Sequence, residues 1–227
     1  MKKIISIMML MIISLSVYAN DIYINQSGAT LDLDVLQDGQ NNTIGSSGTA
    51  SSVIGATTNL AITQIGDSNV MTFDVNGATY TGTFSVTGNS NNIDFNCDSH
   101  GTNSSCGTAT ASIVWVGSSN DIDIDIGETS SATGATVSIT GASGSDSNVV
   151  LGTIDGNSAI LTLSINGDTN NFLVDIDGDG DSVGHTYVHT HTGSIADVDI
   201  TQSGIYDNMI TLTTSGDNHD IDIIQRD

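Results

Sequence analysis

The sequence predicts an all-β protein: a β-solenoid of stacked strand–turn–strand repeats, with roughly seven to nine rungs and loop insertions at its corners. Three observations lead to this prediction. A glycine turn recurs along the chain, alternating apolar residues flank it, and proline is absent although the chain holds 25 glycines. A turn of one shape next to a period-2 strand, repeated at near-regular spacing, is typical of stacked β architectures.

The repeated turn is a glycine followed three residues later by an asparagine. In its clearest copy, Gly66-Asp-Ser-Asn69 precedes Met71, Phe73 and Val75. Similar copies begin at Gly88, Gly117 and Gly167, and looser ones at Gly144, Gly204 and Gly216, the last with His219 in the asparagine place. The glycine is expected to supply a positive φ. The asparagine either forms an amide ladder along the stack or serves as a turn residue that tolerates a left-handed conformation.

The apolar residues on both sides of each turn are expected to face one interior, because residues two apart share a face of a strand. A lone hairpin is marginal in water, whereas stacking at about 4.8 Å buries a continuous core. Extra residues around 98–105, 128–142 and 177–194 are expected to bulge from the corners. No amphipathic helix caps either end of the sequence, so the end strands are predicted to associate.

The first residues predict a secretory signal peptide. Lys2 and Lys3 precede an apolar run that ends at Val17-Tyr-Ala19, and the run is shorter than the roughly 20 residues of a membrane span. Cleavage after Ala19 would divide the chain into a signal peptide, 1–19, and a single solenoid domain, 20–227. No span is expected in the mature chain, which we predict to be secreted.

The mature chain is predicted to be strongly acidic. Removal of the signal leaves Arg226 as the one Lys or Arg against 26 acidic residues, a formal charge of −25. Such a surface repels nucleic acid and anionic membranes and attracts divalent cations. Nucleic acid is therefore not an expected partner.

The two cysteines, Cys97 and Cys106, bracket a short loop. In an exported protein this pair predicts one disulfide. The alternative, a metal site that also uses His100, lacks a fourth ligand nearby.

Calcium is a candidate cofactor. Acidic residues with Gly180 follow the early spacing of a calcium loop, but Thr186 stands where a bidentate glutamate is usual. The alternative is an acidic corner loop that binds nothing. The candidate ligands are Asp175, Asp177, Asp179 and Asp181.

Three histidines share parity with Tyr187 and are expected on one strand face: His185, His189 and His191. Imidazoles at this spacing suit zinc or copper. The alternative is a solvated face with pH sensitivity.

An enzyme is not expected. The sequence has no glycine-rich phosphate loop leading into a helix, no Gly-x-Ser-x-Gly elbow and no lysine after residue 3. Exposed aspartates are abundant, but abundance by itself is typical of solvation.

Some repeats also hold a glutamine two residues before the glycine, as in 62–69 and 36–42 and, in part, in 200–204, 24–28 and 223–225. This Gln-x-Gly-x-x-Asn pattern resembles the curlin repeat of curli, the extracellular amyloid fibres of Gram-negative bacteria. The resemblance implies a β-solenoid subunit that leaves through an outer-membrane secretion pore and polymerises on the cell surface, where such fibres serve adhesion and biofilm cohesion. The turn pattern and the resemblance together predict these ladder residues: Gln26, Gln37, Asn42, Gln64, Asn69, Asn91, Asn120, Asn148, Asn170, Gln202 and Asn208.

The expected function is therefore that of a structural subunit, with another copy or a related fibre subunit as partner in a head-to-tail polymer. The alternative is a monomeric solenoid, either a calcium-stabilised surface adhesin or an ice-binding protein. Ice binding needs flat, regular threonine rows. Thr79, Thr81 and Thr83 form one such run, which the sequence does not repeat at every rung.

Overall fold

The computed structural model describes residues 21–45, 50–97, 108–127, 134–156, 158–177, 184–204 and 208–226. These residues form sixteen β-strands and no helix, and so no helix among them is long and apolar enough to cross a bilayer. The strands are β1 (Asp21–Ile22), β2 (Asn25–Asp38), β3 (Thr43–Ile44), β4 (Ser51–Ile65), β5 (Val70–Thr87), β6 (Asn92–Cys97), β7 (Thr108–Val116), β8 (Asp121–Ile126), β9 (Gly134–Gly141), β10 (Val149–Asp155), β11 (Ala159–Asn166), β12 (Asn171–Asp177), β13 (Thr186–Thr192), β14 (Asp197–Ser203), β15 (Met209–Ser215) and β16 (Asp220–Arg226).

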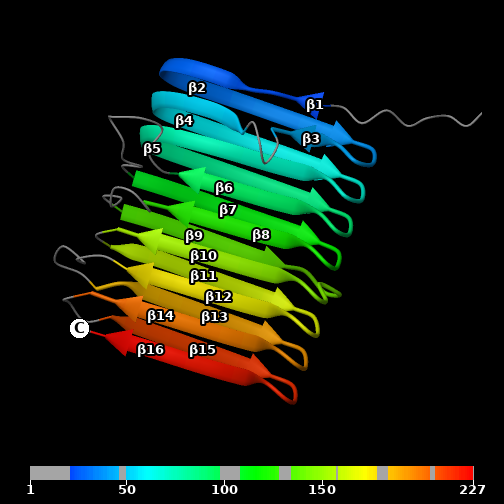
Figure 1. The fold of residues 1–227 in the computed structure, drawn as a ribbon, viewed down its shortest axis with the longest axis vertical. Helices are drawn as coiled ribbons and strands as arrows, with labels where there is room; N and C mark the ends of the chain where they lie inside the picture. Colours follow the sequence, from blue (N-terminus) through cyan, green and yellow to red (C-terminus); the bar gives the residue numbers. More distant parts are fainter. Residues whose placement is uncertain are drawn as a thin grey trace, which may run out of the picture.

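The strands wind into a two-faced β-solenoid of about seven turns, which confirms the predicted fold (Figure 1). Strands that lead into the tight turns form one face, here called the entry face: β7, β9, β11, β13, β15 and the second parts of β2, β4 and β5. Strands that leave the turns form the opposite exit face: β1, β3, β6, β8, β10, β12, β14, β16 and the first parts of β2, β4 and β5. Every strand pairing is parallel, and the apolar side chains of both faces meet between them.

Neighbouring rungs pair without a register shift, so equivalent residues stack in columns along the solenoid. One entry-face column reads Val35, Ile62, Phe84, Ile113, Ile139, Leu163, His189 and Leu212. A slip of one residue would move every inward side chain to solvent. The alternation of apolar and polar residues therefore fixes the register.

Most of the tight turns carry positive φ at two positions, whereas at Gly167, and at Ser145 in the same column, only the residue two places later adopts it. The glycine adopts it, as at Gly66 with φ 128°, and the residue two places later adopts the left-handed conformation, as at Ser68 with φ 61°. The positive φ predicted for the turn glycine is confirmed there. A Cβ on Gly66 would also collide with the carbonyl oxygen of Gly39 in the rung before it. A side chain is therefore excluded at Gly66, because the turns stack directly on one another, although Ser145 occupies the same column in a later turn.

Two of the expected corner insertions contain core strands, and for those parts the expectation was wrong. Residues 134–141 form β9 and residues 186–192 form β13, each a full rung of the entry face. The turn after β13 begins at Gly193 and has Ala196 in the asparagine column, which hid this repeat from the sequence pattern. Residues 128–133 and 178–183, and the whole segment 98–107, lie outside the described residues.

Candidate functional site: interior ladders and open ends

An asparagine ladder runs along the interior edge of the tight turns. The backbone N–H of Asn42 donates to Oδ1 of Asn69 at 2.9 Å, and the same bond recurs at each rung up to that from Asn148 to Asn170 at 3.0 Å. Side-chain amides add a second line of bonds, as from Nδ2 of Asn120 to Oδ1 of Asn148 at 3.2 Å. Six of the predicted ladder residues lie in this column, all of them buried: Asn42, Asn69, Asn91, Asn120, Asn148 and Asn170.

The shared repeat pattern suggested that the glutamines form a single ladder. They do not, because they lie on opposite faces. Gln37 and Gln64 are neighbours on the entry face, and Nε2 of Gln64 donates to Oε1 of Gln37 at 2.8 Å. Gln202 lies on the exit face, where Nε2 of Gln225 donates to its Oε1 at 3.2 Å. Gln26 belongs to the same exit-face column at the other end of the stack.

Apolar residues occupy the middle of the glutamine columns. The exit-face column reads Gln26, Val53, Val75, Cys97, Ile126, Ile154, Ile176, Gln202 and Gln225. Amides therefore stand at the two ends of the solenoid. The central repeats, which have neighbours on both sides, carry an apolar residue where the end repeats carry glutamine.

Asn208 lies at the opposite edge from the asparagine ladder, so its assignment to that ladder was wrong. Its Oδ1 accepts from the backbone N–H of His185 at 2.9 Å, and Nδ1 of His185 accepts from the backbone N–H of Ala159 at 3.0 Å. These residues form a short second ladder where exit strands return to entry strands. The spacing of Gly204 and Asn208 resembles that of the tight turns, but these residues lie at the corner where exit strands return to entry strands.

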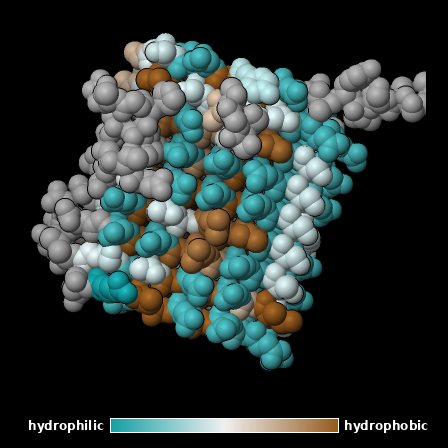
Figure 2. All heavy atoms as spheres, in the orientation of Figure 1, coloured by the Kyte–Doolittle hydropathy of each residue, from teal (hydrophilic) through white to brown (hydrophobic). Residues whose placement is uncertain are grey.

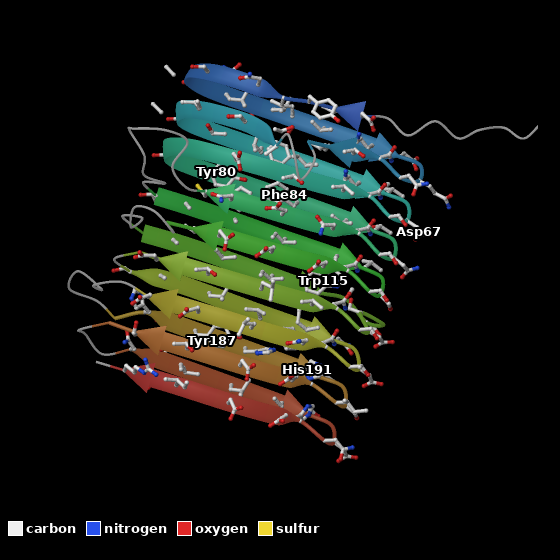
Figure 3. All side chains as sticks on the ribbon, in the orientation of Figure 1. Asp67, Tyr80, Phe84, Trp115, Tyr187 and His191 are labelled. Atoms are coloured by element: carbon white, nitrogen blue, oxygen red, sulfur yellow. The ribbon has the colours of Figure 1, made fainter. Side chains whose placement is uncertain are left out.

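A third ladder, which the sequence pattern did not single out, follows the outside of the tight turns. The carboxylate of Asp67, labelled in Figure 3, accepts from the backbone N–H of Asn89 at 2.7 Å. The side-chain oxygen of Asn89 accepts in turn from the N–H of Ser118 at 2.7 Å, and the bonds continue through Asp146 and Asp168. A polar residue directly after most of the turn glycines, as at Asp67, Asn89 and Asp168, is the signal that could have predicted it.

The apolar interior opens to solvent at the last rung. Ile221 and Ile223 in β16 are 37% and 46% exposed, whereas Val198 and Ile200, which precede them in the same columns, are 0% and 1% exposed. At the first rung, Ile22, Ile24, Leu31, Leu33 and Val35 are only partly buried against the core. Among the described residues, both ends of the solenoid are therefore uncovered strand edges.

The histidines do share a face, but it is the buried one, so the expected solvated face was wrong. His185, His189, His191 and Tyr187 are fully buried, and His189 packs against Phe172 with ring centroids 4.6 Å apart. Burial, with His191 nearby, lowers the pKa of His189 to about 3. Burial likewise lowers the pKa of His191, and the neighbouring His219 adds to this shift, against the opposing effects of the Gly167 carbonyl and Asp168. Within the described ranges, no three His, Cys, Asp or Glu side chains come together to hold a metal.

The remaining candidate ligands and cysteines are only partly described. Asp175 and Asp177 lie on the exposed side of β12, and Asp177 accepts a hydrogen bond from the Ser203 hydroxyl. Burial and then the charge of Asp177 raise the pKa of Asp175. Asp179, Asp181 and Cys106 lie outside the described residues, so the calcium loop and the disulfide stay predictions. Cys97 ends β6 and is fully buried.

The two faces differ in the chemistry of their outward side chains. From Thr57 onward, the described outward positions of the entry strands carry no acid, and threonine and serine recur from rung to rung more regularly than the sequence alone indicated. The hydroxyl columns are Thr81, Thr110, Thr136 and Thr186; Thr83, Ser112, Ser138 and Thr162; and Thr63, Ser85, Thr140, Ser164, Thr190 and Thr213. Val114, Ile160 and Val188 interrupt these columns.

The exit face carries most of the acid. Asp94 pairs with Asp123, and Asp197 and Asp199 with Asp220 and Asp222. Burial, then the charges of Asp125 and Asp74, raise the pKa of Asp94. In Figure 2 the side turned to the viewer is mostly hydrophilic, with apolar residues scattered across it.

Comparisons with known proteins found no match: no protein-family model, no curated protein and no solved structure resembles the chain significantly.

Proposed function

We propose that this protein is a structural subunit of an extracellular fibre that assembles by stacking one solenoid on the next. One observation carries the proposal: complete strand edges and exposed apolar interior stand at both ends of an unshifted parallel stack. Soluble β proteins usually block such edges with proline, bulges or a covering element. The described residues contain no helix to cover them, and the chain has no proline.

The ladders support the same proposal. Backbone bonds and buried asparagines repeat along the stack axis, and glutamine pairs stand near its two ends, so a further rung satisfies the same groups that the internal rungs satisfy. Repeats whose neighbours supply all contacts extend without a built-in limit unless the ends are capped. Export through an outer-membrane pore, a cell-surface location, and a role in adhesion or biofilm matrix belong to the proposal through the curlin resemblance.

The test is fibre diffraction on the mature chain, residues 20–227, after incubation at neutral pH with and without calcium. The proposal expects filaments with reflections near 4.7 and 10 Å, which are the strand and sheet spacings of cross-β order. A monodisperse monomer that persists at high concentration would overturn it. Filaments that form only with calcium would assign a role to the acidic segment around Asp177.

A second candidate, ice binding by the monomer, is favoured by the hydroxyl columns of the entry face. Threonine and serine side chains repeat there about 4.8 Å apart between rungs and about 6.6–6.8 Å apart along each strand. The thermal hysteresis of the monomer tests this candidate. Thr110→Lys should abolish hysteresis, and Asp123→Lys on the exit face is the matched control that should leave it unchanged.

A further inference from the structure

We infer that copies join head to tail in one fixed register, with β15 and β16 of one copy continued by β2 and β1 of the next, and that Gln225 and Gln26 set this register. The inference rests on the proposed fibre function and adds to it the polarity, the register and the residues of the junction. Three sets of groups lead to the same alignment: the strand columns, the glutamines within one of those columns, and the two turn ladders.

The strand columns align the two ends without any offset. Parallel pairing links Asp21 through successive exit strands to Asp220 in one column. A next copy that continues the stack therefore places its Ile22 on Ile221. On the entry face the same continuation places its Leu33 on Ile210 and its Val35 on Leu212. These are apolar residues that the isolated chain leaves partly exposed.

The glutamines make this register specific. Within the chain, Nε2 of Gln225 donates to Oε1 of Gln202, in the same direction as the bond from Gln64 to Gln37. The junction places Gln26 of the next copy over Gln225, so that its amide donates to Gln225 and extends the ladder. A shift of two residues would set Gln225 against Ile24 or Gly28 and leave a buried amide unsatisfied, which costs free energy.

The turn ladders point the same way, and they make the junction polar. On the outside, each backbone N–H donates to the side chain of the preceding rung, as Asp217 does to Ser194, so the Asp217 carboxylate is positioned to accept from Gln40 of the next copy. On the inside, each N–H donates to the following rung, as Ala196 does to Nδ1 of His219. The N–H of His219 is then positioned to donate to Asn42 of the next copy.

A tail-to-tail contact would not preserve these bonds. It would set β16 antiparallel either to β16 or to β15 of the second copy, in a stack where every described pairing is parallel, and it would not present the next-rung partners that the turn ladders use inside the chain. Copies that meet head to tail have none of these mismatches.

The test is cysteine cross-linking between two single variants mixed in equal amounts and assembled together. Asn25→Cys and Ile224→Cys change exposed residues in one exit-face column, and neighbouring rungs bring their Cβ atoms close enough for a disulfide after small adjustments. Ser27→Cys with Ile224→Cys is the off-register control, and Ile224→Cys alone is the tail-to-tail control. The unsubstituted chain gives the background from the native cysteines.

The inference expects the matched pair to cross-link at least about fivefold more than either control, because diagonal neighbours lie too far apart for a disulfide. In the Gln225→Leu background that preference should fall several-fold while filaments still form. Ile176→Leu, in the same column but inside the chain and away from the junction, should leave the preference unchanged. Filaments that cross-link equally in both pairs, or through Ile224→Cys alone, would overturn the junction and leave the fibre function standing. An absence of filaments would overturn the fibre function, and the junction with it.

Discussion

Trp115 and Gly141 stack in one column of neighbouring entry strands, and the indole takes the space that a side chain on Gly141 would need. A Cβ on Gly141 would come within 2.7 Å of Cζ2 of Trp115. Figure 3 shows Trp115 on the same series of strands as Phe84 and His191. Trp115, the largest buried side chain, therefore fits because the next rung has a glycine in the same column.

Gly141→Ala should destabilise the solenoid by about 1–3 kcal/mol, the usual cost of overpacking a core. The matched control is Gly152→Ala. Gly152 also points into the interior of the solenoid, but a Cβ there would meet only Cδ2 of Leu161, at 3.8 Å. Denaturant unfolding of the unassembled chain, followed by Trp115 fluorescence, measures both. Equal midpoints for the two variants would contradict the packing argument.

Asn120→Ala should cost at least about 1–3 kcal/mol, because it leaves buried donors without acceptors. Oδ1 of Asn120 accepts from the backbone and side-chain nitrogens of Asn91 at 3.0 and 3.1 Å, and its Nδ2 donates to the carbonyl of Gly117 at 3.1 Å. Asn171→Ala, at an exposed asparagine just after the ladder, should change the unfolding midpoint little. A similar loss in both variants would show that the ladder adds nothing specific.

Stability should fall with acid through the buried histidines. The pKa of His189 is about 3 in the folded chain and 6.5 when unfolded, so its contribution is complete above pH 6.5 and is lost as the pH falls from 6.5 toward 3. One such group gives a slope of about 1.4 kcal/mol per pH unit. Hydrogen exchange in β13 and β15 at pH 7 and pH 4.5 measures the loss.

His189→Leu is the informative variant for that slope. Its neighbours in the column are Leu163 and Leu212, so leucine suits the position. In this variant the slope of stability against pH should decrease by the contribution of His189, and the contribution of His191 should remain. An unchanged slope would contradict the role of His189.

The acidic exit face should show the opposite pH dependence. Because the pKa of Asp94 is raised in the folded chain, its ionised form destabilises the fold at neutral pH, and protonation relieves this as the pH falls through the folded pKa. Asp94→Asn should therefore raise the melting temperature at pH 7 and have little effect at pH 4. Added salt should reduce the difference in melting temperature between Asp94→Asn and the unsubstituted chain at pH 7. Asp34→Asn on the entry face is the control, and an equal gain there would indicate only a net-charge effect.

The local pattern was sufficient to predict the turn and the strands around it. Gly66 and Asn69 identify one rung without reference to any other, because positive φ and period-2 alternation are properties of a few neighbouring residues. The pattern failed at Gly193, where Ala196 replaces the asparagine and His189 replaces an aliphatic residue. It also failed at Asn208, where a similar spacing occurs at the opposite corner.

The sequence by itself determined the repeat, the stacked architecture and most of the inward residues, since these depend on local conformation and on which side chains avoid water. Only the tertiary structure decided which residues become neighbours between rungs. The corner segments vary in length, so distance along the chain does not reveal that Gln37 and Gln202 lie on opposite faces while Gln26 and Gln225 share one column. The accumulated register of parallel pairs places those glutamines at the two ends of the solenoid.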